Sequence, residues 1–549
     1  MADHLLEVRN LSVEFHTVNG VVHAVRDIAY HLDRSETLAI LGESGSGKSV
    51  SSSAIMNLID MPPGRITSGE ILLDGEDLLT MPAEARRAIN GPRIAMIFQD
   101  PLSHLNPVYT VGWQICEAMT THGMASDGAR SEALRLLGRV GIPDPENAMG
   151  KYPHEFSGGQ RQRVMIAMAL ALKPGLLIAD EPTTALDVTV QAEVLALLKE
   201  LQQETGMAVL IITHDLGVVA DIADRVVVME KGVLVEGGSV REVYKNARHP
   251  YTKKLIAAAP GKGSMHEPIA LGEPLLAVKD VRKFYGVFEA LKGVSFNLMA
   301  GETMAVVGES GSGKSTLARV LLRLEEPDGG SAHWKGKDLF QMQPGELYKL
   351  RRDLQMVFQD PTQSLNPRMT VYQLVSEAWV IHPDILPKAK WRERVAELLD
   401  QVGLSQEHMS RYPHQFSGGQ RQRIAIARAL ALEPQLIICD EAVSALDVSV
   451  QAQVIDLLDK LRRDMGIAFI FIAHDLPVVR DFADHVMVME KGEIVELGTV
   501  RQVFDSPRED YTRALLGASL DPDPDVQSAR REARQAGLSA TAPHFKRSF

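Results

Sequence analysis

Short apolar runs without alternation predict the buried strands of this chain. Residues 36–42 read ETLAILG, residues 176–180 read LLIAD and residues 208–213 read AVLIIT. A strand with one face in water alternates apolar and polar side chains, whereas a strand covered on both faces does not. Stretches with helical periodicity separate these runs, so the pattern predicts an α/β core built on a parallel sheet.

A second pattern interrupts this alternation. Between residues 101 and 156, and again between residues 361 and 416, apolar side chains recur with the period of a helix. The positions that share one helical face are Ala133, Leu134, Leu137 and Val140 in the first stretch, and Val395, Leu398, Leu399 and Val402 in the second. We therefore expect an α-helical subdomain inserted into each of two α/β cores.

The chain contains one set of motifs twice. The repeated pairs are LGESGSGKS and VGESGSGKS at residues 41 and 307, IFQDP and VFQDP at 97 and 357, FSGGQRQR at 156 and 416, LLIADE and LIICDE at 176 and 436, and IITHDL and FIAHDL at 211 and 471. The first pair is offset by 266 residues and the others by 260. The expectation is two homologous domains in tandem, at residues 1–260 and 275–519, with a linker at 261–274 and a loose polar tail at 520–549.

Composition narrows the classes of function. The 549 residues carry a formal net charge of -13, which argues against a protein that binds nucleic acid by neutralising phosphates. No run approaches the roughly 18 apolar residues of a membrane span, and the N-terminus lacks the apolar core of a signal peptide. The only cysteines, Cys116 and Cys439, can build neither a disulfide framework nor a cysteine-rich metal site. A reducing, cytosolic setting fits them.

Each half carries a glycine-rich loop of the form G-x-x-x-x-G-K-[ST] after a predicted strand. In such a loop backbone N–H groups surround phosphate oxygens at a helix N-terminus, the lysine reaches the β- and γ-phosphates, and the last hydroxyl ligates Mg²⁺. The expected nucleotide-binding residues are Gly42, Ser44, Gly45, Gly47, Lys48 and Ser49 in the first half, and Gly308, Ser310, Gly311, Gly313, Lys314, Ser315 and Thr316 in the second. A chance glycine turn is the alternative, and two copies in matching context make it negligible.

Two carboxylates end a buried strand in each half. Asp180 and Glu181 complete the first such strand, and Asp440 and Glu441 repeat them. Because doubly wound sheets bind ligands at the carboxyl ends of their strands, we expect the aspartates to hold Mg²⁺ and the glutamates to polarise the attacking water. The alternative interpretation is that these acids cap the next helix.

Two further polar positions repeat at strand ends. Gln99 and Gln359 are expected to reach Mg²⁺ and the attacking water, and His214 and His474 to contact the γ-phosphate. A single Gln or His at a strand end is more often structural, but the repeated position relative to the lysine and the glutamate favours function. The sequence therefore predicts two complete sites for ATP hydrolysis with Mg²⁺.

Two aromatic residues stand at matching places before the phosphate loops. Phe15 precedes the first loop and Tyr285 the second. Each ring either stacks on adenine or packs in the core, and the sequence leaves both interpretations open. Cys439, which replaces Ala179 beside the acidic pair, is expected to be an inert core residue.

In this order the motifs resemble those of ATP-binding cassette (ABC) ATPases. GESGSGKS, FSGGQ, LLIADE, TALD and the histidine of IITHD stand in that family's order, and the resemblance covers residues 5–519. It implies two P-loop domains of α/β fold, each with a RecA-like core, an antiparallel β subdomain and a helical insert, packed head to tail as an intramolecular pseudo-dimer. The implied partners across that pseudo-dimer are Ser417, Gly418 and Gly419 for the site at Lys48, and Ser157, Gly158 and Gly159 for the site at Lys314.

Within the family the chain is more similar to the ATPases of oligopeptide and dipeptide importers. This similarity rests on FQDP followed by LNP, on YPHEFSGGQRQR and YPHQFSGGQRQR, and on HPYTKKLIAAAP and DYTRALLGAS after the two halves. Importers of glutathione or nickel are also similar to this branch and share the same sequence pattern. The resemblance implies a peripheral subunit on the cytoplasmic face of the membrane, whose helical subdomains dock onto two permease subunits while a solute-binding protein outside delivers the peptide.

The chain departs at two places from the pattern of the branch that it resembles. Several single-cassette members carry a cysteine cluster after HPYT, but GKGSMHEP at residues 261–268 has no cysteine, so no iron–sulfur cluster is expected. DEAVSALD replaces the usual DEPTSALD in the second half. It keeps Asp440, Glu441 and Asp447, so activity is expected to persist.

Tandem cassettes that act on ribosomes or on DNA are the competing class. Ribosome-acting members usually have a long charged helical linker, and DNA-repair members usually carry zinc-binding cysteine pairs. Neither feature is present, and the acidic balance disfavours nucleic acid as a partner. A non-hydrolysing ATP switch is disfavoured too, because both candidate general bases are present.

Overall fold

The computed structural model describes residues 4–18, 20–184, 186–261, 263, 273–444 and 446–541. Two compact units make up the chain: the first comprises residues 1–186, 190–259 and 520–549, and the second comprises residues 187–189 and 260–519. Among the described residues, no helix combines the length and the apolar character needed to cross a membrane.

The first unit is built on two sheets. Its strands are β1 (Leu6–Thr17), β2 (Gly20–Leu32), β3 (Thr37–Leu41), β4 (Gly64–Leu73), β5 (Glu76–Asp77), β6 (Ile94–Ile97), β7 (Leu176–Asp180), β8 (Ala208–Thr213), β9 (Arg225–Glu230) and β10 (Val233–Ser239). A six-stranded sheet has the order β10-β9-β3-β8-β7-β6, with every neighbouring pair parallel except β9 and β10. The antiparallel sheet has the order β2-β1-β4-β5. Strands β3, β7 and β8 are buried along their whole length, as their non-alternating sequences predict.

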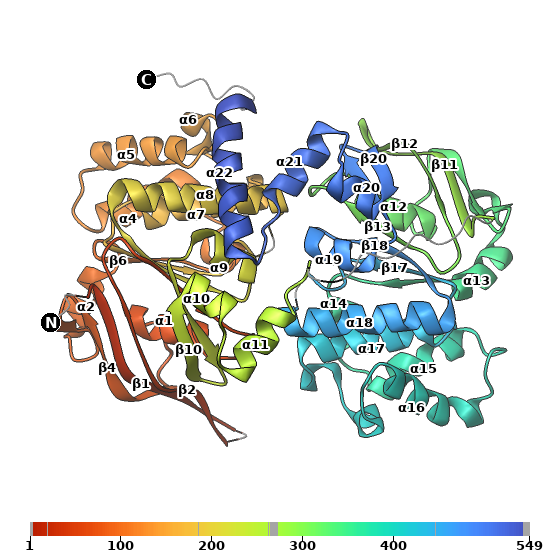
Figure 1. Ribbon diagram of the computed structural model, residues 1–549, viewed down its shortest axis with the longest axis horizontal. Helices are drawn as coiled ribbons and strands as arrows, with labels where there is room; N and C mark the ends of the chain where they lie inside the picture. The colour runs from red at the N-terminus through yellow and green to blue at the C-terminus, as the bar shows by residue number, and fades with distance from the viewer. Residues whose placement is uncertain are drawn as a thin grey trace. The chain divides into compact units, whose positions relative to one another are not determined.

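Helices surround this sheet and form the predicted insert (Figure 1). They are α1 (Lys48–Met56), α2 (Ala83–Ile89), α3 (Pro101–His104), α4 (Val111–Thr120), α5 (Ser126–Arg139), α6 (Pro145–Ala148), α7 (Gly158–Ala169), α8 (Val188–Thr205), α9 (Leu216–Ile222), α10 (Val240–Lys245), α11 (Pro250–Ala257) and α22 (Pro524–Thr541). Between β6 and β7, helices α4, α5 and α7 pack on one another. On the predicted face of α5 and at its end, Ala133, Leu137 and Val140 are buried, and Leu134 is half-buried.

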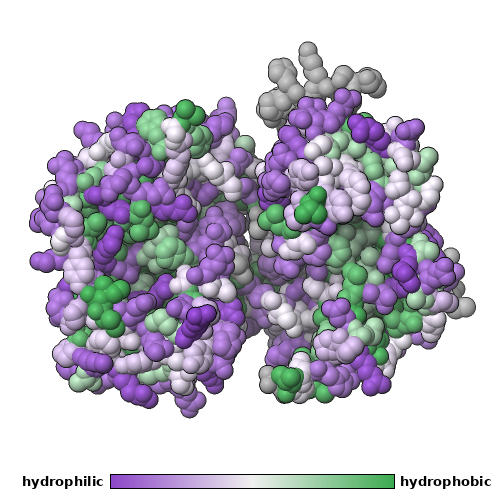
Figure 2. Space-filling model, turned by 180° about the vertical axis from the view of Figure 1, so that it is seen from behind, coloured by the Kyte–Doolittle hydropathy of each residue, from purple (hydrophilic) through white to green (hydrophobic). Residues whose placement is uncertain are grey.

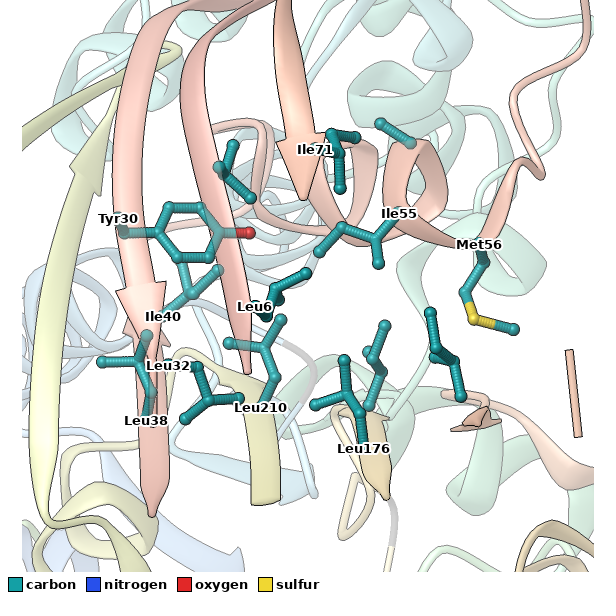
Figure 3. Packing of buried hydrophobic residues seen from close by; sticks show 14 of the residues in the cluster. Leu6, Tyr30, Leu32, Leu38, Ile40, Ile55, Met56, Ile71, Leu176 and Leu210 are labelled. Carbon is teal, nitrogen blue, oxygen red and sulfur yellow. The ribbon is translucent and has the colours of Figure 1, made fainter. Parts of the chain in front are cut away.

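The hydrophobic core of the first unit lies between its two sheets and α1 (Figure 3). Leu6 and Tyr30 reach it from the antiparallel sheet, Ile55 from α1, and Ile40 and Leu210 from the six-stranded sheet. Burial of these side chains holds α1, and with it the loop that precedes α1, against the ends of the parallel strands.

The second unit repeats this architecture. Its strands are β11 (Leu276–Tyr285), β12 (Phe288–Leu298), β13 (Thr303–Val307), β14 (Gly329–Trp334), β15 (Lys337–Asp338), β16 (Leu354–Val357), β17 (Leu436–Asp440), β18 (Ala468–Ile472), β19 (His485–Glu490) and β20 (Glu493–Thr499). The sheet orders are β16-β17-β18-β13-β19-β20 and β12-β11-β14-β15. The two units therefore share one fold, with an α/β core, an antiparallel β subdomain and a helical insert, which confirms the predicted fold class.

The helices of the second unit match those of the first. They are α12 (Lys314–Leu321), α13 (Pro344–Asp353), α14 (Pro361–Ser364), α15 (Val371–Ile381), α16 (Trp391–Gln401), α17 (Gly418–Leu430), α18 (Val448–Met465), α19 (Leu476–Phe482), α20 (Val500–Asp505) and α21 (Asp510–Ala518). The apolar positions expected on the insert, Val395, Leu398, Leu399 and Val402, are all buried. On the face shown in Figure 2, hydrophobic residues form separate small patches among hydrophilic ones.

The structure corrects the expectation of a loose tail after residue 519. Helix α22 packs against α9 and α10 of the first unit (Figure 1). Gln527 is fully buried, and its Nε2 donates to Oδ1 of Asp221 at 2.8 Å. Arg534 contributes a second bond of 2.9 Å to the same oxygen. Polar side chains make these contacts, so the sequence of α22 shows no apolar stripe from which docking could be predicted. Residues 542–549 lie outside the described part.

Most of the predicted linker, residues 261–274, lies outside the described residues. Gly261 and Gly263 are described, and their backbone N–H groups donate to the Asp481 carboxylate of the second unit at 2.6 and 3.1 Å. Asp481 stands 260 residues after Asp221, so matching aspartates each hold the segment that follows a domain.

Candidate active site

The glycines of the first phosphate loop are required for different structural reasons. A Cβ atom on Gly42 would lie 2.3 Å from the carbonyl oxygen of Met229, and one on Gly47 would lie 2.3 Å from that of Ala24. Gly45, at φ +74°, would meet no atom within 4 Å. Two glycines therefore let the loop pack tightly on its neighbours, while Gly45 leaves an exposed backbone that a phosphate can approach.

The lysine and serine at the start of α1 point toward the loop and the acidic pair. Lys48 is buried, and its Nζ donates to the carbonyl oxygens of Gly42 at 2.6 Å and Glu43 at 2.8 Å. Ser49 Oγ donates to Asp180 Oδ1 at 3.2 Å. A hydroxyl and a carboxylate side by side are the oxygen donors that a hard divalent cation prefers, so these residues fit Mg²⁺.

Three side chains surround the carboxylate of Glu181. Gln99 Nε2 donates to Oε2 at 2.7 Å, and Thr184 Oγ1 donates to the same oxygen at 3.0 Å. His214 Nδ1 lies 3.0 Å from Oε1. The structure thus brings the predicted residues Gln99, Glu181 and His214 together, beside Asp180 and the phosphate loop.

The pKa values of the two neighbouring carboxylates of the first unit are shifted in opposite directions. Burial raises the pKa of Asp180 to about 6, against a hydrogen bond from Ser49 that favours its charged form. Burial also opposes ionisation of Glu181, but hydrogen bonds from His214 and Thr184 outweigh it and lower the pKa of Glu181 below its ordinary value. Glu181 is therefore ionised at neutral pH, as a general base must be.

The second unit assembles the same residues with similar distances. Lys314 Nζ donates to the carbonyl oxygens of Gly308 at 2.7 Å and Glu309 at 3.0 Å, and Ser315 Oγ donates to Asp440 Oδ1 at 3.1 Å. Burial lowers the pKa of Lys314 and raises that of Asp440.

The surroundings of Glu441 are looser than those of Glu181. Gln359 Nε2 donates to Glu441 Oε2 at 2.6 Å, but His474 Nδ1 lies 3.6 Å from that oxygen. Ser444, at the place of Thr184, donates instead to the backbone carbonyl of Glu441 at 3.0 Å. The nearby His474 imidazole lowers the pKa of Glu441 against the effect of burial.

The repeated motif FSGGQRQR, here called the signature motif, contains two glycines after its serine. These two glycines have separate roles. Ser157 caps α7, because its Oγ accepts from the backbone of Gln160 at 3.3 Å. Gly158 is exposed, and a Cβ there would meet no atom within 4 Å, whereas a Cβ on Gly159 would lie 2.4 Å from Cγ1 of Val190.

The same division holds in the second unit. There a Cβ on Gly419 would lie 2.1 Å from Cγ1 of Val450. Ser417 caps α17 in the same way, and Gly418 is exposed. The sequence predicted both glycines of each pair as ligand contacts and missed the packing of the second.

The two aromatic candidates differ in their surroundings. Phe15 is half-buried and packs against the hydrophobic core of the first unit. Tyr285 is 45% exposed, and its hydroxyl donates to Glu325. The exposed ring of Tyr285 leaves a face on which a base can stack, whereas the ring of Phe15 packs against the hydrophobic core.

Sequence reasoning missed several residues near these sites, among them Thr184, Tyr251 and Tyr511. Thr184 contacts Glu181 directly, as described above. Tyr251 and Tyr511, in the repeated segments HPYT and DYT, contact the two phosphate loops: each hydroxyl accepts a loop N–H at 3.1 Å. The repetition of these segments after both domains was the one sequence signal that could have indicated a role for the two tyrosines. Their residue types alone do not indicate a contact with the phosphate loops.

Comparison with known proteins gives matches along most of the chain. Residues 25–184 and 291–444 match the family model described as ABC transporter, and residues 235–275 and 495–544 match the one described as oligopeptide/dipeptide transporter, C-terminal region. The glutathione import ATP-binding proteins GsiA of Shigella boydii serotype 4 (strain Sb227) and Escherichia coli (strain K12) are 47% and 46% identical over 572 residues, covering 96% of this chain and 92% of each relative. A solved dimeric ATP-binding cassette in a post-hydrolysis state with ADP and Pi is 31% identical, covers 41% of this chain and 99% of its own, and has a TM-score of 0.38.

Proposed function

Because this chain belongs to the ABC transporter ATPase family, we propose that it hydrolyses ATP to power the uptake of dipeptides, oligopeptides or the tripeptide glutathione through separate membrane permeases. The observation that carries the proposal is the assembly, in both units, of the phosphate loop, the Asp–Glu pair, the glutamine and the histidine. The peptide class is supported by the oligopeptide/dipeptide model, which matches after each domain, and by the glutathione importers among the relatives.

The chain's own residues suit in-line attack of water on the γ-phosphate. The loop N–H groups and the Lys48 ammonium would receive the phosphate oxygens. Glu181 is held by Gln99, Thr184 and His214, so its ionised carboxylate can orient a water and accept the proton that leaves as the water oxygen bonds to phosphorus. Mg²⁺, held by Ser49 and Asp180 with Gln99 nearby, would supply neutralisation of phosphate charge. Ser315, Asp440 and Gln359 repeat these roles in the second unit.

Docking onto permeases is supported by exposed apolar side chains close to Gln359. In the second unit a pocket of about 360 Å³ includes Leu324, Phe358 and Ile381, whose side chains are exposed. Phe358 directly precedes Gln359, so a partner in this pocket would contact the neighbour of a residue that touches Glu441. We propose that two permease subunits dock at the helical inserts and that the chain is peripheral, on the cytoplasmic face of the membrane, with a solute-binding protein supplying the peptide from outside.

The pairing of signature residues with the opposite phosphate loop stays a prediction. Family resemblance supports it, and the intact caps at Ser157 and Ser417 are compatible with it. Photolabelling with 8-azido-ATP and peptide mapping would check it in a Ser417→Ala variant. Labelling at the Lys48 loop is expected to fall, and a loss confined to the Lys314 loop would contradict the pairing.

The experiment that tests the proposed function is reconstitution. The chain, its candidate permeases and a solute-binding protein are placed in proteoliposomes, and uptake of labelled glutathione, a dipeptide and nickel is measured with Mg-ATP. Peptide uptake together with a rise in ATPase rate over the isolated chain is expected. Equal ATPase rates with and without the membrane partners, or stimulation by ribosomes or DNA instead, would contradict the importer.

A further inference from the structure

The segment after each domain reaches back to the phosphate loop of its own unit. In the first unit the hydroxyl of Tyr251, on α11, accepts the backbone N–H of Glu43 at 3.1 Å. In the second unit the hydroxyl of Tyr511, on α21, accepts the backbone N–H of Glu309, also at 3.1 Å. The same contact between a tyrosine hydroxyl and a phosphate-loop N–H therefore recurs in both units.

The residue that each tyrosine holds is also the residue that the loop lysine holds. The carbonyl oxygen of Glu43 accepts from Lys48 Nζ at 2.8 Å, and that of Glu309 accepts from Lys314 Nζ at 3.0 Å. One loop residue is therefore fixed at its N–H by a hydroxyl and at its C=O by an ammonium group. The position of this residue sets the direction of the loop as it leaves the strand.

The helix that carries each tyrosine is itself anchored. Glu236 on β10 accepts the backbone N–H groups of Arg248 and His249 at 2.7 and 3.1 Å, just before α11. Glu496 on β20 accepts those of Arg508 and Glu509 at 2.9 and 3.3 Å, just before α21. Each tyrosine is thus presented from a fixed helix start and not from a loose extension.

Burial keeps the hydroxyl of Tyr511 in one chemical state. Tyr251 and Tyr511 are both half-buried. Burial raises the pKa of Tyr511 to about 12, so its hydroxyl stays neutral at any pH at which the protein would work. A neutral hydroxyl can accept the N–H bond throughout.

We propose that Tyr251 and Tyr511 are positioning residues, which hold the phosphate loops in the conformation that receives ATP. This rests on the proposed function, because it takes ATP as the ligand at Lys48 and Lys314. The C-terminal extensions then take part in nucleotide binding through the loop. Each tyrosine acts on its own unit only.

Phenylalanine substitution isolates the hydroxyl. Tyr251→Phe keeps the ring and removes the acceptor, so the loop N–H loses a partner in the nucleotide-free protein and the loop can leave its binding conformation. We expect the dissociation constant for Mg-ATP at the Lys48 site to rise about two- to tenfold, the effect of one neutral hydrogen bond.

The test measures nucleotide affinity of the full chain, one site at a time. Tyr251→Phe is made in a Lys314→Ala background, and Tyr511→Phe in a Lys48→Ala background, and binding of a fluorescent ATP analogue with Mg²⁺ is titrated. Tyr244→Phe and Tyr348→Phe are the matched controls, because their hydroxyls donate to the carbonyl oxygens of Leu216 and Ile381, at 2.8 and 2.5 Å, away from the loops. Thermal unfolding without nucleotide is recorded for all variants.

Weaker binding in Tyr251→Phe and Tyr511→Phe, at their own sites and with stabilities like those of the controls, would support the positioning role. Unchanged affinity, or a loss equal to that of the controls, would overturn it and leave the tyrosines with a structural role alone. Failure of the proposed function is distinguishable, because the titration needs no permease: a chain that binds ATP but drives no uptake would still show the effect.

Discussion

Glu181 and Glu441 share an unusual backbone conformation. Both have positive φ, 45° and 49°, a region that costs a residue with a side chain about 1–3 kcal/mol. Each backbone N–H donates to the carbonyl oxygen of the neighbouring strand, at 2.8 and 3.0 Å, and holds the residue there. Strain of this kind persists where the surrounding structure enforces it, and here it directs a carboxylate toward a glutamine and a histidine.

Substitution of these carboxylates should stop turnover. Glu181→Gln and Glu441→Gln are each expected to lower ATP hydrolysis at their own site by about 10²- to 10⁴-fold, because an amide cannot accept the proton of the attacking water. ATP binding should persist. Single-turnover hydrolysis in the reconstituted complex measures the effect, with the exposed Glu204→Gln as a control. A variant that keeps the wild-type rate would remove that glutamate from catalysis.

The two signature glycines should respond differently to alanine. Gly159→Ala places a methyl group against Val190, whose branched side chain has little freedom in a helix, so a loss of about 1–3 kcal/mol in unfolding free energy is expected. Gly158→Ala should leave stability unchanged, since no atom lies within 4 Å of the added carbon. Urea denaturation measures both.

Val190→Ala should restore the stability of Gly159→Ala, because it removes the atom that the new methyl group meets. If Gly158→Ala is as destabilising as Gly159→Ala, the exposed position of Gly158 is contradicted.

At the scale of single residues, the repeated motifs predicted the charged side chains that the structure brings together. Lys48, Asp180 and Glu181 lie together because their positions after strands of one parallel sheet place them at one edge. The partners that depend on packing were not predictable. Thr184 reaches Glu181 only through the turn that follows β7, and neither its residue type nor its spacing indicates that contact.

Among the elements, apolar periodicity predicted the buried strands and the helical inserts, because burial on both faces or on one face leaves a readable pattern. Helix α22 is the exception. It docks through Gln527 and Arg534 onto a buried carboxylate, and polar contacts of that kind leave no period in the sequence.

Strand β19 differs from its counterpart β9 in one titratable contact. Arg225 begins β9 and pairs with Glu36 at 3.0 Å, whereas His485 begins β19 with its Nδ1 2.7 Å from Glu302. The buried Glu302 carboxylate holds the pKa of His485 above its ordinary value. The protonated form is therefore the stabilising one.

The second unit should lose stability as pH rises. The contribution of His485 is complete below the unfolded-state pKa of about 6.5 and disappears as pH passes the higher folded-state pKa. Urea unfolding at pH 6 and pH 9, followed by tryptophan fluorescence in a Trp113→Phe background, reports on the second unit, which holds the other three tryptophans. In His485→Arg this part of the pH dependence should vanish, and an unchanged profile would contradict the assignment.

For the molecule as a whole, the chain passes from the first unit to the second and returns. Residues 520–549 group with the first unit, so both ends of the second unit are joined to it. Asp221 is 4% exposed, and its side chain accepts two hydrogen bonds from this returning segment, one from Gln527 and one from Arg534. The repeated motifs predict two domains in series, and nothing in them indicates this return.

Removal of residues 520–549 should loosen α9. Amide hydrogen exchange in Leu216–Ile222 is expected to accelerate about tenfold or more, because a buried carboxylate loses its donors, while α19 of the second unit keeps its exchange rate. In an Asp221→Asn background the same deletion should have a smaller effect, since no charge is left without partners. Equal acceleration in both backgrounds would show that Asp221 does not carry the contact.

The return of α22 also affects the order in which the protein is completed during synthesis. Gln527 follows Asp221 by 306 residues. At the roughly 5–20 residues per second of translation, about 15–60 s separate the emergence of the carboxylate from that of its donor. Domains fold from the N-terminus as they emerge, so the first unit waits with α9 uncovered until the last helix leaves the ribosome. A product that terminates early keeps that surface open to cellular proteases, whereas the finished chain closes it.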